Sequence, residues 1–194
     1  MQQAWQKVDP TFYVRMYRQK SLGVLAKIPD AAVANLIELL EAARCEARQV
    51  FVCGNGGSAC TATHFAAGLS KEGSTGRERR FRAACLSDNV AWLTALANDT
   101  DYSQVFVEQL KNHAQPGDVL IAFSGSGESA NVVRAVEWAN EGGLCTVAIS
   151  GRTGGTLGRI AQHKVLVDTA HMGNVEEAHF LIQHLITYYF META

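Results

Sequence analysis

Hydrophobic and polar positions follow two different periods along this chain. In the first 47 residues, apolar side chains recur at intervals of three and four, as at Tyr13, Met16 and Tyr17. This spacing is typical of helices with one apolar face. Pro29-Asp30 interrupts the pattern and is expected to separate one helix from the next. We therefore predict two helices before the first strand.

From residue 48 onward, short apolar runs alternate with helical segments. The expected strands are 49–53, 81–86, 119–123, 145–149 and 164–167. The expected helices are 58–69, one that Asp88 caps, 99–113, 129–140 and 174–189. Repeated strand–helix order with buried apolar strands is typical of parallel sheets covered by helices. The pattern predicts an α/β fold, a doubly wound parallel five-stranded sheet with helices on both faces.

Two segments rich in serine and glycine stand where a strand should end and a helix begin. Their sequences are CGNGGS at 53–58 and SGSGES at 124–129. The unpaired N–H groups and the dipole of a helix N-terminus attract anions, and glycine lets the backbone approach closely. Ligands of doubly wound sheets lie at this edge. The pattern predicts a phosphate site, and the alternative is that the glycines only form tight turns.

The phosphate is expected to be a single monoester. Neither segment has the GxGxxG pattern of dinucleotide sites, and no GxxxxGK[ST] segment of a nucleoside-triphosphate site is present. Serine hydroxyls stand where a triphosphate site would have lysine. We therefore expect no nucleotide cofactor.

Composition narrows the class of protein. The chain has 194 residues, 47% hydrophobic and 19% charged, with a net charge of −2, which fits one ordinary domain and gives no basic excess for nucleic acid. Five cysteines lie scattered without CxxC spacing, as expected for core residues in a reducing compartment. The N-terminus is polar and no apolar run approaches the ~20 residues of a membrane span. We expect a cytoplasmic protein with no membrane and no direct nucleic-acid partner.

The N-terminal segment carries several aromatic side chains, namely Trp5, Phe12, Tyr13 and Tyr17. One interpretation is a helix that covers its own sheet, and the other is an exchange of helices between subunits. We expect residues 1–47 to serve packing and oligomerisation, and residues 48–194 to form the phosphosugar-binding core of the same single domain.

Four segments carry a resemblance to a known family. CGNGGSACTATHFAAGLSK, LANDTDYSQVF, GDVLIAFSGSGESANVVRA and EEAHFLIQHLI resemble the corresponding parts of bacterial phosphoheptose isomerases, which have a sugar isomerase (SIS) domain. The chain also resembles a non-enzymatic relative that associates with the replication initiator DnaA. The resemblance implies a flavodoxin-like SIS domain, a homotetramer or at least a homodimer, and a site between subunits.

The resemblance also implies the residues that bind the phosphate and the sugar. The serine loop supplies most of the phosphate contacts, the first glycine loop adds others, and an Asn-Asp pair lies near the sugar. These residues are Asn55, Gly56, Gly57, Ser58, Asn98, Asp99, Ser124, Gly125, Ser126 and Ser129.

An aldose–ketose isomerase needs an acid and a base to move protons between adjacent atoms. In the phosphoheptose isomerases, a helix histidine is followed four residues later by a glutamate, and a glutamine and a histidine lie near the C-terminus. Here the corresponding residues are His64, Gly68, Glu176 and His184. The resemblance implies a Zn²⁺ site of His64, Glu176 and His184, and we expect Glu176 and His184 to be the catalytic pair.

Gly68 leaves alternatives open. The histidines could serve local hydrogen bonding or core packing, and Glu176 could serve the helix dipole. Glu72 and Glu128 are other acids near the loops, although a carboxylate at Glu128 would repel phosphate unless it points away. The function implied is isomerisation of a sugar phosphate resembling sedoheptulose 7-phosphate. The alternatives are a different phosphosugar with a rearranged base, or a non-catalytic phosphosugar-binding regulator with a protein partner.

Overall fold

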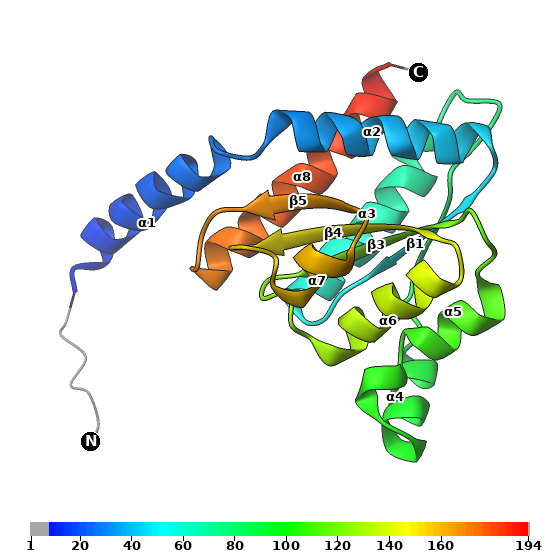
Figure 1. Cartoon of the computed structure of the whole chain (residues 1–194). Coiled ribbons are helices and arrows are strands. Elements are labelled where there is room, and N and C mark those ends of the chain that lie inside the picture. Colours follow the sequence, from blue (N-terminus) through cyan, green and yellow to red (C-terminus); the bar gives the residue numbers. More distant parts are fainter. Residues whose placement is uncertain (1–7, 194) are drawn as a thin grey trace.

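A computed structural model describes residues 8–193, and its centre is a parallel sheet (Figure 1). The five strands lie in the order β2-β1-β3-β4-β5, and all pair in parallel. This flavodoxin-like order confirms the predicted doubly wound α/β fold. The strands are β1 (Gln49–Cys53), β2 (Arg82–Cys85), β3 (Val119–Ser124), β4 (Cys145–Gly151) and β5 (His163–Val167).

Helices cover both faces of the sheet (Figure 1). The α-helices are α1 (Pro10–Leu25), α2 (Asp30–Cys45), α3 (Gly57–Ser70), α4 (Val90–Asp99), α5 (Val107–His113), α6 (Ala130–Glu141), α7 (Gly155–Ile160) and α8 (Met172–Glu192). There are also two short 3-10 turns. The turn η1 (Glu72–Ser74) follows α3, and the turn η2 (Tyr102–Gln104) lies between α4 and α5.

Two hydrophobic cores lie on the two faces of the sheet, because successive strand side chains point to opposite sides. On one face, Ile121 and Phe123 of β3 pack with α2, α3 and α8. On the other face, Leu120 and Ala122 pack with α5, α6 and α7. All six residues of β3 are buried, so the loop that follows β3 stands on a rigid support.

The prediction of one continuous helix over 99–113 is wrong. In the structure α4 ends at Asp99, and Asp101 begins the turn η2 by accepting a hydrogen bond from the Ser103 N–H at 2.8 Å. The chain therefore turns before α5 begins. The predicted Asp88 cap is also wrong, because Asn89 caps α4 by accepting from the Trp92 N–H at 3.1 Å.

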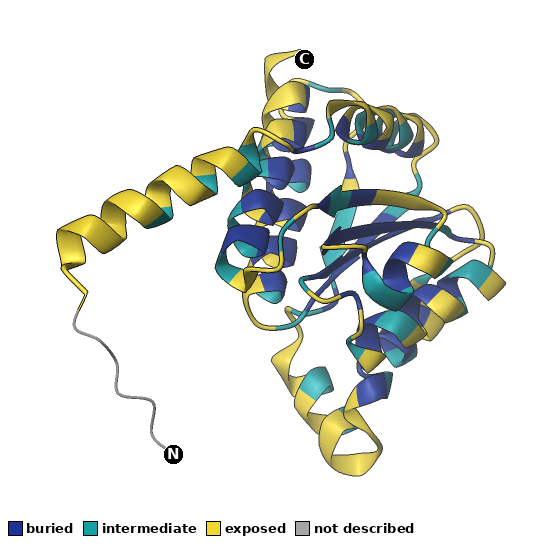
Figure 2. Cartoon of the chain, turned by 60° about the vertical axis from the view of Figure 1, so that its left-hand side comes forward, coloured by how far each residue is buried: buried dark blue, intermediate teal, exposed yellow. Residues whose placement is uncertain are grey.

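Helix α1 extends away from the rest of the chain (Figure 2). None of its residues is buried, and Phe12 is 58% exposed. Its contact with the body is local, as where the Asn174 amide donates to Ser21 Oγ at 2.8 Å. Helix α1 therefore does not cover its own sheet; Trp5 lies outside the described residues. Among residues 8–193, no helix is long and apolar enough to cross a membrane.

Candidate functional site

The serine loop between β3 and α6 forms one wall of a small pocket at the carboxyl ends of β1 and β3. The pocket has a volume of about 160 Å³. It brings together six of the residues predicted to bind phosphate and sugar and adds three others. The lining residues are Asn55, Ser58, Phe123, Ser124, Gly125, Ser126, Ser129, Met172 and Glu176. We call it the serine pocket.

Hydrogen bonds within the loop fix two of its serines. Ser124 Oγ accepts from the Gly127 N–H at 3.1 Å, and Ser126 Oγ accepts from the Glu128 N–H at 3.1 Å. Gly127 has a φ of +71°, and a Cβ there would overlap the backbone of the neighbouring loop. Ser129 precedes α6 without making a side-chain capping bond. Its hydroxyl can therefore donate to an anion at the helix N-terminus.

Asn55 is held in the serine pocket by a pair of amide–amide bonds. Its Nδ2 donates to Asn131 Oδ1, and the Asn131 Nδ2 donates back to Asn55 Oδ1, both at 2.8 Å. The Tyr102 hydroxyl donates to the same Asn55 oxygen at 3.0 Å. Sequence reasoning missed Asn131 and Tyr102, although Asn131 lies only two residues after Ser129 and could have been noticed there.

Glu128 points away from the serine pocket. Its two carboxylate oxygens accept from the Thr156 N–H at 2.9 Å and the Thr156 hydroxyl at 2.7 Å. The side-chain bond from Thr156 lowers the pKa of Glu128. The expected repulsion of a bound phosphate is therefore reduced, because this negative charge lies against the start of α7.

The Asn-Asp pair lies apart from the serine pocket within one chain. Asn98 and Asp99 are exposed at the end of α4, and the Asn98 amide donates to Asp99 Oδ1 at 2.8 Å. Asp99 lines a different hollow, together with Trp92 and other residues of α4. The structure thus does not bring these two residues to the phosphate loop of their own chain.

The two predicted histidines meet in a second cavity, beside α3 and α8. The Nε2 atoms of His64 and His184 are 3.3 Å apart. Burial and the nearby His64 lower the pKa of His184, which favours its neutral form. The cavity has a volume of about 350 Å³, and we call it the histidine cavity. Its lining residues are His64, Ala67, Gly68, Lys71, Glu72, His184, Thr187 and Tyr188.

The predicted zinc site is not assembled in this structure. Glu176 lines the serine pocket, whereas His64 and His184 line the histidine cavity. Glu176 and His184 are eight residues apart on α8, about 12 Å along a helix that rises 1.5 Å per residue. Within residues 8–193, no three His, Cys, Asp or Glu side chains are grouped to hold a metal ion. The pairing of Glu176 with His184 in catalysis stays a prediction.

Comparisons with known proteins agree with the fold. The SIS domain family matches residues 16–151. The phosphoheptose isomerase of Mycobacterium bovis is 42% identical over 158 residues, 81% of this chain and 80% of the relative. That of Rhodospirillum rubrum is 33% identical over 176 residues, 89% and 93% of the two chains. A solved phosphoheptose isomerase from Neisseria gonorrhoeae superimposes with a TM-score of 0.88 at 28% identity, covering 96% of this chain and all of its own.

Proposed function

The chain belongs to the SIS domain family of phosphoheptose isomerases, and we propose that it isomerises a sugar phosphate between its aldose and ketose forms. The proposal rests on the serine pocket, whose hydroxyls lie at a helix N-terminus, and on the histidine cavity, which is lined from the same two helices, α3 and α8. The three relatives reported above are all named phosphoheptose isomerases, which gives the non-catalytic alternative no support.

In this proposal the phosphate occupies the serine pocket. Ser126, Ser129 and the backbone around Gly125 donate hydrogen bonds to its oxygens, and Ser58 and Asn55 contribute from the β1–α3 loop. Hydrogen bonds to a charged oxygen contribute more than neutral ones, about 1.5–3 kcal/mol each. The other predicted ligands, Gly56, Gly57 and Ser124, act through the backbone that shapes these two loops.

The reacting carbons would extend toward the histidine cavity. Ser58 in the serine pocket and His64 in the histidine cavity are six residues apart on α3, about 9 Å at 1.5 Å per residue. This separation favours a substrate with its phosphate at one end of a long chain and its carbonyl at the other. Sedoheptulose 7-phosphate has this form. His184 would move the proton between the two oxygens, and Glu176, which lines the serine pocket, would contact the sugar next to the phosphate.

Zn²⁺ is not part of the proposed steps, because the residues that would hold it are not grouped. The activity assay is nevertheless run both with and without added Zn²⁺. Activity that appears only with added Zn²⁺ would indicate that Glu176 moves toward the two histidines.

We further propose that the chain is a single SIS domain that acts in the cytoplasm as a homotetramer. Residues 1–47 would serve oligomerisation, since α1 buries none of its own residues. Helix α4 also has no buried residue, so the Asn98-Asp99 pair at its end could reach the site of a neighbouring subunit. Light scattering should give the mass of four chains, and deletion of residues 1–25 should reduce it.

The direct test is turnover of a panel of aldose and ketose phosphates by the purified chain, with and without Zn²⁺, while calorimetry measures their binding. Isomerisation of one member supports the proposal. Binding without turnover of any member would instead favour the regulator.

A further inference from the structure

Among the described residues, one carboxylate lines the histidine cavity, that of Glu72. Glu72 lies in the 3-10 turn η1, directly after α3, and lines the cavity with His64 and His184. We propose that Glu72 is the general base that moves the proton between the two carbons of the substrate. This inference rests on the proposed isomerase function and assigns the base of that same site.

Gly68 cannot supply this group, and the space beside it is already filled. A Cβ on Gly68 would lie 2.9 Å from Thr187 Oγ1 and 3.0 Å from Thr187 Cγ2. Four residues later, about one helical turn, Glu72 faces the same cavity. The Glu72 carboxylate therefore lies on the wall of the cavity that holds the two histidines.

The turn that carries Glu72 is firmly held. The Ser74 hydroxyl donates to the Leu69 carbonyl at 2.9 Å and accepts from the Phe81 N–H at 2.9 Å. Gly73 is buried against Phe81 and Phe190. A Cβ added to Gly73 would lie 3.4 Å from Phe190 Cβ and 3.5 Å from the ring of Phe81. A base on such a turn is held in place before the substrate binds, which lowers the entropic cost of aligning it for proton transfer.

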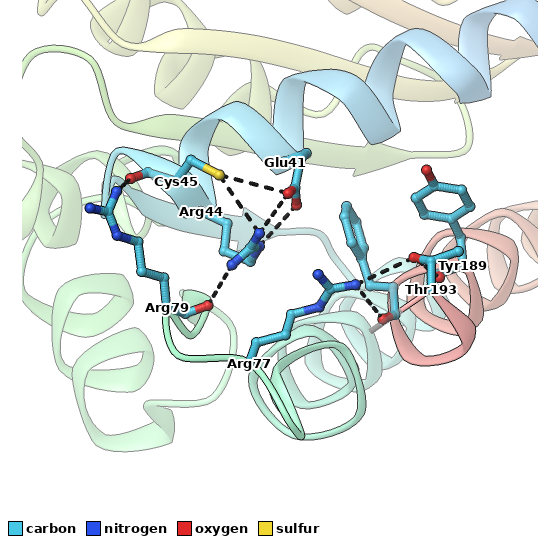
Figure 3. A network of polar contacts seen from close by, with 8 residues as sticks. Glu41, Arg44, Cys45, Arg77, Arg79, Tyr189 and Thr193 are labelled. Atoms are coloured by element: carbon cyan, nitrogen blue, oxygen red, sulfur yellow. Dashed lines mark hydrogen bonds and ion pairs between the residues drawn. The ribbon is translucent and has the colours of Figure 1, made fainter.

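Arginines fix the segment that follows the turn (Figure 3). Arg77 Nη2 donates to the Phe190 carbonyl at 2.8 Å, near the end of α8. Arg79 donates to the Cys45 carbonyl at the end of α2, and Arg44 Nη1 donates back to the Arg79 carbonyl at 2.8 Å. The positive charges lie at helix C-termini, where the dipole favours them. The segment after the turn is thus attached to the C-terminal ends of α8 and α2.

The charges around Glu72 keep it ionised, as a base must be. Lys71 Nζ lies 3.1 Å from Glu72 Oε1. The hydrogen bond from Lys71 lowers the pKa of Glu72, and the nearby His64 lowers it further. The side chain of Glu72 is 32% exposed, so it can reach a substrate that enters from solvent.

The proposed step balances without any co-reactant. Glu72 removes a proton from C1 of the ketose, and the C–H electron pair forms a C1=C2 double bond. The C2 carbonyl oxygen takes a proton from His184, which gives an enediol. His184 then regains a proton from the C1 hydroxyl as the C1 carbonyl forms, and Glu72 returns its proton to C2.

The test compares four variants of the full chain in the isomerase assay, run in deuterium oxide so that exchange at carbon is also measured. Glu72→Gln should lower kcat about 100-fold or more and abolish deuterium uptake, while the affinity for the sugar phosphate stays within a few fold. Glu72→Asp should recover part of the rate. Glu78→Gln, an exposed residue of the same segment, is the matched control and should be unchanged. Glu176→Gln tests the competing carboxylate.

A fifth variant guards against a folding defect. Gly68→Glu with Thr187→Ala, added to Glu72→Gln, should place a carboxylate in the same cavity and restore deuterium uptake. If wild type is active and Glu72→Gln keeps its rate and its exchange, Glu72 is not the base and the isomerase function stands. If Glu176→Gln alone abolishes exchange, Glu176 is the base. If wild type turns over no sugar phosphate, the proposed function fails, and the role of Glu72 fails with it.

Discussion

Lowering the pH should destabilise this protein through His179, a histidine buried between α8 and the sheet. Its side chain is fully buried, and neither ring nitrogen has a hydrogen-bond partner among the described residues. Burial lowers the pKa of His179 from 6.5 to about 4. The ring centroid lies 5.6 Å from that of Phe123, which lines the serine pocket.

The sign and size of the effect follow from these two pKa values. Below pH 6.5 the unfolded chain binds a proton at His179, but the folded chain does not until about pH 4. Stability is therefore complete above pH 6.5 and falls as the pH drops toward 4. At 1.36 kcal/mol per pKa unit, the loss between pH 7 and pH 4 is about 3 kcal/mol.

Urea unfolding between pH 7 and pH 4 measures this loss. His179→Phe removes the titration and places a ring of similar size against Phe123, so its free energy of unfolding should fall about 3 kcal/mol less than that of wild type. His163→Phe, at an exposed position in β5, is the control and should follow wild type. Parallel pH profiles of wild type and His179→Phe would refute the reasoning.

Three further predictions concern the two glycine loops. Ser129→Ala should weaken sugar-phosphate binding about 10-fold or more, since one bond to a charged oxygen is lost, without a change in Tm; unchanged calorimetric affinity would place the phosphate elsewhere. Gly127→Ala should lower the free energy of unfolding in urea by about 3 kcal/mol through backbone strain. The control Gly23→Ala, at an open helical position, should leave that free energy unchanged or raise it. Equal effects of the two substitutions would contradict the loop geometry. Gly57→Ala places a Cβ 2.5 Å from Glu176 Oε1 and should displace that carboxylate, weakening sugar binding in calorimetry; wild-type affinity would remove Glu176 from the site.

The strands were predictable from the sequence because each is a short apolar run with turn residues beside it. The first strand, Gln49–Cys53, has the bounds predicted for it. The error over 99–113 has a local cause, since the turn at Asp101 depends on one side-chain bond that helical periodicity does not reveal. The short helix α7 was missed for a similar reason, because glycines at 154 and 155 with positive φ start it.

The site was predictable only in part. Two local loops supply most of the serine pocket, and their residues were identified from the glycine and serine pattern. The pairing of Asn55 with Asn131 joins residues 76 positions apart, and no local pattern encodes it. The separation of Glu176 from His184 and the approach of Glu72 depend on how α3, η1 and α8 pack. That packing is a tertiary property, set by shape and burial rather than by spacing along the chain.

The measurement that most directly tests the central claim is isomerisation of sedoheptulose 7-phosphate by the purified chain in deuterium oxide, followed by NMR. We expect conversion between ketose and aldose, with deuterium at the carbon that receives the proton. The double variant Ser126→Ala/Ser129→Ala should lose both at substrate concentrations that saturate wild type. Binding of the sugar phosphate with neither conversion nor deuterium uptake, with or without Zn²⁺, would contradict it.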